Sequence, residues 1–88
     1  MVGFYKIAGW LKAEDATGFD QKPPFEYTLT SRVRVRSMYK KYCHESDDPR
    51  LIKVFYYYAG DKLDRTEDFE FAGFPELVKR KIPALSNA

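Results

Sequence analysis

The hydrophobic period of the chain changes within residues 25–43, FEYTLTSRVRVRSMYKKYC, and this change limits the possible folds more than any other feature. Phe25, Tyr27 and Leu29 alternate with polar residues, which is typical of a β-strand with one buried face. The alternation can be extended through residues 33–35 as one long strand, which would place Arg32, Arg34 and Arg36 in a row on one face.

A helix that begins near Ser31 is the alternative, and we favour it. Ser31 can cap such a helix, and residues 47–49, Asp-Asp-Pro, supply a stop after it. The apolar residues would then share one helix face at the spacing i, i+3, i+4, i+7: Val35, Met38, Tyr39 and Tyr42. Met, Lys and Arg, which are frequent here, also favour a helix. Residues 25–43 are therefore predicted to be a strand followed by a helix.

The rest of the chain predicts further strands, a loop, two turns and an ambiguous end. These parts are, in order, a strand at 4–11, a loop at 12–24 that ends in two prolines, a strand at 51–58, a turn at Ala59-Gly60-Asp61, a short returning strand around Leu63, and a tight aromatic turn at 71–74. Residues 75–83 fit either a last strand or one helical turn, and Pro83 would end both.

Length and composition indicate one domain, 1–88, with residues of about 3–82 ordered and a loose C-terminal tail. Hydrophobic residues make up 44% of the chain and aromatic residues 17%, which is enough for a core. Cys43 has no second cysteine to pair with. Neither a signal-peptide pattern nor a run of roughly 20 apolar residues is present, so we expect an intracellular protein, cytoplasmic or nuclear, without membrane contact.

Charge is unevenly distributed, although the net charge is only +2. Residues 32–41 hold five cations and no acid, whereas most of the acids fall in residues 45–48 and 61–70. A chain with one basic and one acidic region can orient a charged partner even near neutrality.

The order of predicted elements indicates an α+β protein, and specifically a β-grasp fold: a mixed sheet of four to five strands packed on one helix. The residues resemble the SUMO-type ubiquitin-like proteins. The segments that carry the resemblance are FEYTLT, SRVRV and SMYKKYC for the second strand and the helix, VFYYYAGDKL for the next strand and turn, and DRTEDFEFAGF for an acidic loop followed by a Leu-Gly-Met-like segment. They span residues 25–74.

The resemblance implies a non-enzymatic module that binds partner proteins non-covalently in the groove between the second strand and the helix. In that family an extended hydrophobic peptide with adjacent acids adds a strand to the sheet edge there. The corresponding positions are Tyr27, Thr28, Leu29, Thr30, Arg34, Ser37, Met38 and Lys41. The family is rich in lysine at this groove, so Arg34 and Lys41 would have to replace part of that charge. The chain ends in Pro-Ala-Leu-Ser-Asn-Ala without the family's Gly-Gly, so conjugation is not expected.

Two other functions remain open from the sequence. The chain could be a small accessory subunit of a larger assembly, with its exposed aromatic residues serving as packing surface. It could also bind nucleic acid, with the cations of residues 32–41 on phosphates and Tyr56 and Tyr58 stacking on bases.

Catalytic, metal and cofactor sites are not predicted. Cys43 and His44 suggest a nucleophile and base, but adjacent helical residues point about 100° apart and no third group orients the histidine. The acids of residues 61–70 lack the spacing of a calcium loop, and Lys62 and Arg65 interrupt them, so we expect a solvated loop.

Overall fold

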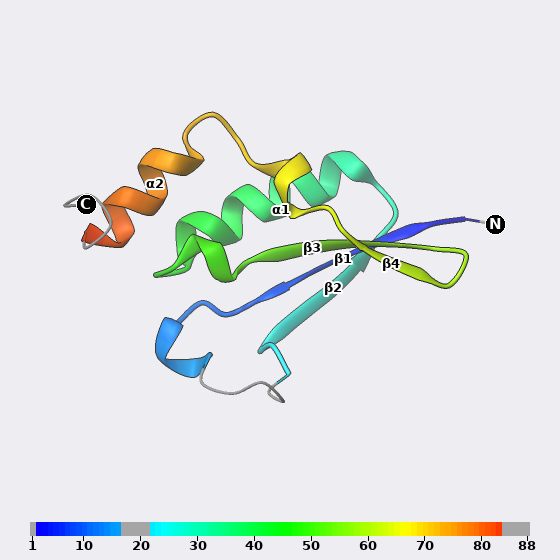
Figure 1. The fold of residues 1–88 in the computed structure, drawn as a ribbon, viewed down its shortest axis with the longest axis horizontal. Coiled ribbons are helices and arrows are strands. Elements are labelled where there is room, and N and C mark those ends of the chain that lie inside the picture. Colours follow the sequence, from blue (N-terminus) through cyan, green and yellow to red (C-terminus); the bar gives the residue numbers. More distant parts are fainter. Residues whose placement is uncertain (1, 17–21, 84–88) are drawn as a thin grey trace.

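The structure, a computed structural model, describes residues 2–16 and 22–83. Its strands are β1 (Phe4–Gly9), β2 (Phe25–Leu29), β3 (Lys53–Tyr58) and β4 (Asp61–Asp64), and its α-helices are α1 (Arg32–Glu45) and α2 (Phe74–Lys81) (Figure 1). Short 3₁₀ turns occupy Ala13–Asp15, Pro49–Leu51 and Thr66–Phe69. The prediction of an α+β protein is confirmed. The predicted tail at 84–88 lies outside the described residues.

The sheet has the strand order β2-β1-β3-β4, and each of its pairings is antiparallel. The predicted mixed sheet is therefore wrong. Strands β2 and β3, which α1 connects, run in the same direction but lie on either side of β1. Because β1 separates them and runs the opposite way, no hydrogen-bonded pair among the described strands is parallel. The prediction of one helix is also incomplete, since α2 is a second one.

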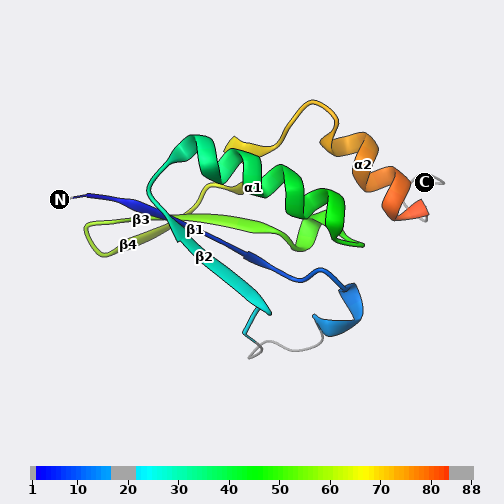
Figure 2. The ribbon, with the colours of Figure 1, turned by 180° about the vertical axis from the view of Figure 1, so that it is seen from behind.

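Both helices lie on the same side of the sheet (Figures 1 and 2). The strand register places Ile7 of β1 beside Val54 of β3, and both side chains are fully buried on this side. Val35, Tyr39 and Cys43 of α1 are also fully buried in the same core. The one-turn spacing of these three residues, i, i+4 and i+8, explains why α1 presents a narrow apolar stripe to the sheet.

The helix prediction for residues 31–43 is confirmed. The Ser31 hydroxyl accepts a hydrogen bond from the Arg34 backbone N–H at 3.3 Å, so Ser31 is the N-cap. In the predicted stripe Val35 and Tyr39 are fully buried, whereas Met38 and Tyr42 are half-buried at its edges. The long strand that the arginine alternation allowed does not form, because β2 ends at Leu29.

The ambiguous C-terminal segment is a helix. Pro75 lies in the first turn of α2, where its missing N–H costs nothing, and the helix ends at Lys81, two residues before Pro83. The Lys81 ammonium donates hydrogen bonds to the backbone carbonyls of His44 and Ser46, at the C-terminal end of α1. A cation suits a helix C-terminus, so this contact fastens α2 to α1. None of the described helices has the length and apolarity that crossing a membrane requires.

Candidate functional site

Strand β2 forms one edge of the sheet. Its residues 25–29 pair with β1, and on its other side it has no neighbouring strand among the described residues. The backbone N–H and C=O groups that point outward from an edge strand can pair with an added strand. Helix α1 follows β2 after two residues and contacts it, so edge and helix together form the candidate groove that the sequence predicted.

A pocket of about 340 Å³ lies between the end of β2 and the first turns of α1. It is lined by Leu29, Val33, Arg34, Ser37 and Met38. Leu29 and Met38 are half-buried, while the Val33 side chain is 72% exposed. The pocket is near the small end of ligand sites, which suits one or two apolar side chains of a peptide better than a large cofactor.

The structure brings four of the eight predicted groove residues into this pocket: Leu29, Arg34, Ser37 and Met38. It adds Val33, which the sequence interpretation missed. Val33 and Ser37 are one helical turn apart, and this i, i+4 relation was the available signal. In the sequence, however, Val33 belongs equally well to the arginine-valine alternation.

The other four predicted groove residues, Tyr27, Thr28, Thr30 and Lys41, do not line the pocket. The Tyr27 ring stacks on Tyr42 of α1, with centroids 6.1 Å apart, and is 44% exposed. Hydrogen bonding to Tyr27 raises the pKa of Tyr42 to about 12. Thr28 is paired with Lys6, one position out of phase with Tyr27, so its side chain faces the opposite side of the sheet. Thr30 is exposed just after β2.

Cations stand at both ends of this groove. Arg34 lines the pocket, and the Lys41 ammonium lies 5.6 Å from the centroid of the Tyr42 ring. Seven residues of helix separate the two, which corresponds to about 10 Å along the axis. A partner with acids beside an apolar core would meet positive charge at either end.

The first turn of α1 contains no acid, and Arg32 and Arg34 lie there instead. Cations at a helix N-terminus oppose the helix dipole, typically by about 0.3–1 kcal/mol each. These two arginines therefore slightly destabilise the helix, and they create positive potential beside the pocket. This charge pattern is expected for a surface that attracts anionic groups.

Cys43 lacks the surroundings of a nucleophile. Its thiol is fully buried, and burial raises the pKa of Cys43 to about 12. His44 is exposed, its Nδ1 lies 2.8 Å from the Lys40 carbonyl oxygen, and its ring stacks on Phe71. At neutral pH the thiol is therefore protonated and shielded, and the imidazole contacts other groups.

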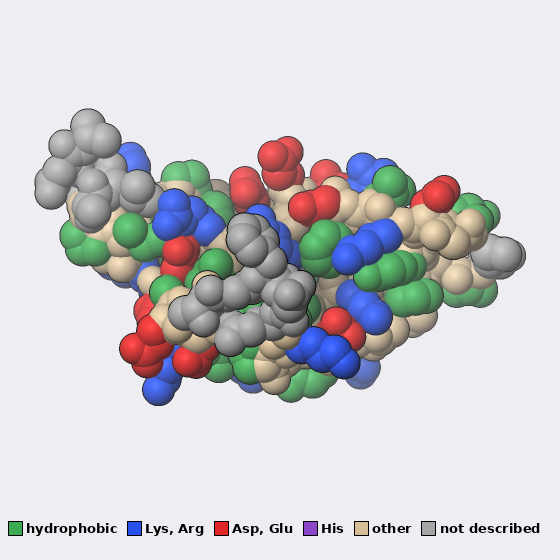
Figure 3. Space-filling view, turned by 60° about the horizontal axis from the view of Figure 1, so that its bottom comes forward, with side chains coloured by type: hydrophobic (Ala, Val, Ile, Leu, Met, Phe, Trp, Pro, Cys, Tyr) green, Lys and Arg blue, Asp and Glu red, His purple; other side chains and the backbone are tan. Residues whose placement is uncertain are grey.

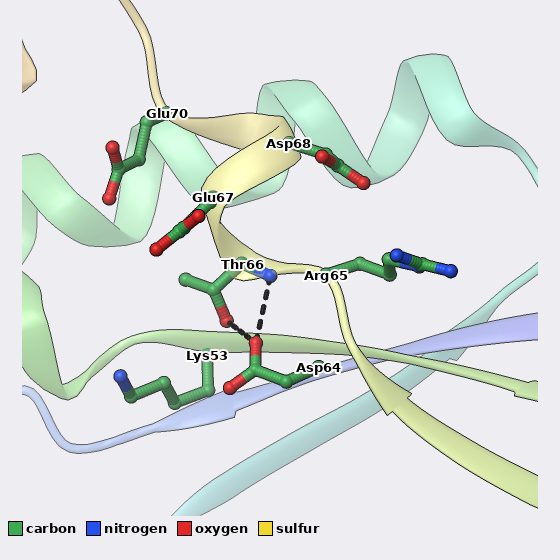
Figure 4. Close-up of a pocket in the computed structure, with 7 residues that line it drawn as sticks. All are labelled: Lys53, Asp64, Arg65, Thr66, Glu67, Asp68 and Glu70. Atoms are coloured by element: carbon green, nitrogen blue, oxygen red, sulfur yellow. Dashed lines mark hydrogen bonds between the residues drawn. The ribbon is translucent and has the colours of Figure 1, made fainter.

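The acidic residues after β4 surround a polar pocket of about 460 Å³. The side chains that line it are Lys53, Asp64, Arg65, Thr66, Glu67, Asp68 and Glu70 (Figure 4). The carboxylates of Glu67, Asp68 and Glu70 point in different directions. Within the described residues, no group of three or more acidic, histidine or cysteine side chains is placed to hold a metal ion.

Asp64 of this segment forms hydrogen bonds with Thr66 that support the fold. One of its oxygens accepts hydrogen bonds from the Thr66 N–H at 2.9 Å and the Thr66 hydroxyl at 2.7 Å, and this lowers the pKa of Asp64. The buried Thr66 oxygen in turn accepts from the Val54 N–H at 3.0 Å. Asp64 and Thr66 therefore fasten the end of β4 to β3.

Comparison with known proteins gives no relative for this chain. No family model matches it, and no curated protein or solved structure matches it either.

Proposed function

We propose that this protein is a small, non-enzymatic module that binds partner proteins through the groove between β2 and α1. One observation carries the proposal: a sheet edge with no neighbouring strand in the described part of the chain lies beside a mostly apolar pocket, with a cation at each end of the groove. The partner segment would be extended, with aliphatic side chains for the pocket and acids next to them.

Each part of the groove has a separate role in this binding. The β2 backbone supplies main-chain hydrogen bonds, which give affinity without sequence preference. The pocket selects an apolar side chain, because Val33 is largely exposed and gains burial when it is covered. Arg34 and Lys41 favour acidic neighbours and fix the orientation of the segment.

The resemblance to SUMO-type proteins supports the position of this groove and the type of ligand. A β-grasp identity remains a proposal, and the antiparallel pairing of β1 with β3 speaks against it, because that fold has a mixed sheet. The groove proposal does not depend on the family, since it rests on the edge strand, the pocket and the cations.

An NMR titration tests the groove. A short peptide with a run of valine and isoleucine followed by aspartate and glutamate is added to ¹⁵N-labelled protein. We expect the amide signals of residues 27–30 and 33–41 to shift. Arg34→Glu should weaken binding about tenfold, which corresponds to about 1.4 kcal/mol.

Arg36→Glu is the matched control, because it makes the same charge change on the same helix at a residue outside the pocket. It should reduce affinity much less than Arg34→Glu. Equal losses in the two variants, or amide shifts that avoid the groove, would contradict the proposal.

A role as a subunit of a larger assembly is the second candidate, and one observation favours it. Exposed apolar side chains also occur outside the groove, at the β3–β4 end: Val2, Tyr58 and Leu63 are 82%, 48% and 41% exposed. Val2 and Tyr58 line a second apolar pocket of about 290 Å³. If this candidate is correct, the isolated chain should self-associate in light scattering, whereas the groove module should remain monomeric.

A further inference from the structure

The side of the sheet that faces away from both helices has a composition of its own. Strand register places ten residues on this side, of which six supply the rings and the cations that we call the open sheet face: Phe4, Lys6, Lys53, Phe55, Tyr57 and Lys62. The other four are Ala8, Glu26, Thr28 and Asp64. All ten are out of phase with Ile7 and Val54, which face α1. No described helix covers this side, and Figure 3, in which it comes forward, shows lysine and arginine side chains between hydrophobic ones.

The rings of the open sheet face are already arranged as a stack. Phe4 and Tyr57 are nearly parallel, with an interplanar angle of 6° and centroids 5.1 Å apart. The Lys62 ammonium lies 4.4 Å from the Phe55 centroid and 6.0 Å from that of Tyr57. The three rings are half-buried, so each still presents surface to solvent.

Two of the three lysines of this face make no ion pair within the described residues. Lys6 pairs with Glu26 at 3.3 Å, whereas Lys53 and Lys62 have no ion-pair partner among residues 2–16 and 22–83. Of the acids nearby, Glu26 faces Lys6, and Asp64 is hydrogen-bonded to Thr66. The positive charge of Lys53 also contributes to the lowered pKa of Asp64, without a direct ion pair. Flat rings interleaved with cations complement a ligand that carries planar aromatic groups on a negatively charged backbone.

We propose that the open sheet face binds single-stranded nucleic acid. Bases would stack on Phe55 and Tyr57, and the phosphates would pair with Lys6, Lys53 and Lys62. A single strand is favoured over a duplex, because only unstacked bases expose the ring faces that a flat aromatic surface can reach. This site is separate from the groove, and it does not depend on the function proposed there.

The placement differs from the nucleic-acid surface that the sequence suggested. Tyr56 faces the helix side, where its ring lies 4.7 Å from Tyr5, and Tyr58 shares that side. The cations of residues 32–41 belong to α1, which covers the opposite face. The rings and the lysines therefore meet on the open sheet face and not on the helix.

Fluorescence anisotropy with labelled oligo-dT and oligo-U of about 20 nucleotides tests this proposal, since this length exceeds the roughly 4–16 nucleotides that one small domain covers. We expect binding at low salt. Three phosphate contacts predict that log K falls with log salt at a slope of about −2. The double variant Lys53→Gln/Lys62→Gln should lose at least tenfold in affinity. Its single remaining phosphate contact should bring the slope of log K against log salt to about −0.7. Phe55→Leu, which keeps apolar bulk, should lose at least fivefold.

The matched control is Arg36→Gln/Lys40→Gln, which removes two charges from α1 and should leave affinity nearly unchanged. Circular dichroism of each variant verifies that the fold is kept. The proposal is overturned if no binding occurs at low salt, or if a duplex binds as well as a single strand. It is also overturned if the double variant on α1 loses as much affinity as the double variant on the sheet. It is equally overturned if Phe55→Leu has no effect, because the lysines alone would then account for binding.

Discussion

Tyr39 and Cys43 are one turn apart on α1 and are both fully buried. Among the described residues the Tyr39 hydroxyl makes no hydrogen bond of normal geometry, although it interacts with the nearby Cys43 thiol, and that thiol donates to the Pro49 carbonyl at 4.0 Å. A buried hydroxyl without a partner usually costs about 1–3 kcal/mol. Tyr39 nevertheless fills the centre of the core and contacts the rings of Phe71 and Phe74. Its ring therefore stabilises the fold, and its hydroxyl opposes this.

The same two groups predict the response to alkaline pH. Burial raises the pKa of Tyr39 well above its ordinary value of 10, and that of Cys43 from 9.0 to about 12. A raised pKa means that the folded state holds its proton more tightly than the unfolded state. The two protonated groups therefore contribute fully to the free energy of unfolding below about pH 9. As pH rises from 9 toward 12 the unfolded state loses these protons first, and the contribution is lost. Melting temperatures between pH 7 and 11 should show this fall.

Tyr39→Phe separates the hydroxyl from the ring. It should raise stability at pH 7 by up to about 1 kcal/mol, because it removes the unpaired group, and it should make the alkaline loss shallower. Tyr58→Phe is the control, because Tyr58 is 48% exposed, and it should change neither quantity. A Tyr39→Phe protein that is less stable at pH 7 would indicate that the hydroxyl has a partner.

At the level of elements, the β3–β4 hairpin is set by a two-residue turn. Tyr58 pairs with Asp61, and between them Ala59 and Gly60 have φ of 51° and 86°. Two successive positive φ values are those of a type I′ turn, which matches the twist of a hairpin. Glycine adopts this conformation freely, but alanine does so at a cost.

Ala59→Asn should therefore stabilise the domain, because asparagine tolerates the left-handed region better than alanine. We expect a gain of about 0.5 kcal/mol, which for a domain of this size raises the melting temperature by about 2–4 °C. Ala72→Asn is the control, since Ala72 is also exposed and its φ is not positive. A gain that is the same at both positions would show that the turn is not the cause.

Local patterns predicted the strands and α1, but neither α2 nor the pairing of the strands. The Ser31 cap and the apolar stripe from Val35 identified α1 from neighbouring residues alone. Which strands pair is decided by contacts distant in sequence, so the insertion of β1 between β2 and β3 had no local signal. For the same reason Phe4 and Tyr57, 53 positions apart in sequence, were not recognised as one surface.

Across the whole molecule, the two proposed surfaces face different directions. The groove lies at the β2 edge on the helix side, whereas the open sheet face lies on the opposite side. Thr28 illustrates this separation of the two surfaces. Its backbone belongs to the β2 edge of the groove, whereas its side chain faces the side of the sheet opposite the helices. A protein segment and a nucleic-acid strand would therefore reach the domain without sharing a side-chain contact.

This geometry predicts simultaneous binding. With the acidic peptide at saturation, the affinity for oligo-dT should fall less than about threefold, because only long-range repulsion, screened within about 10 Å at 0.1 M salt, connects the two ligands. Anisotropy titrations with and without peptide measure it, and Arg34→Glu, which weakens the peptide site alone, is the control. Full competition would contradict two separate surfaces. A peptide that fails to bind would remove the groove proposal, and oligo-dT that fails to bind would remove the sheet-face proposal, so each can be lost without the other.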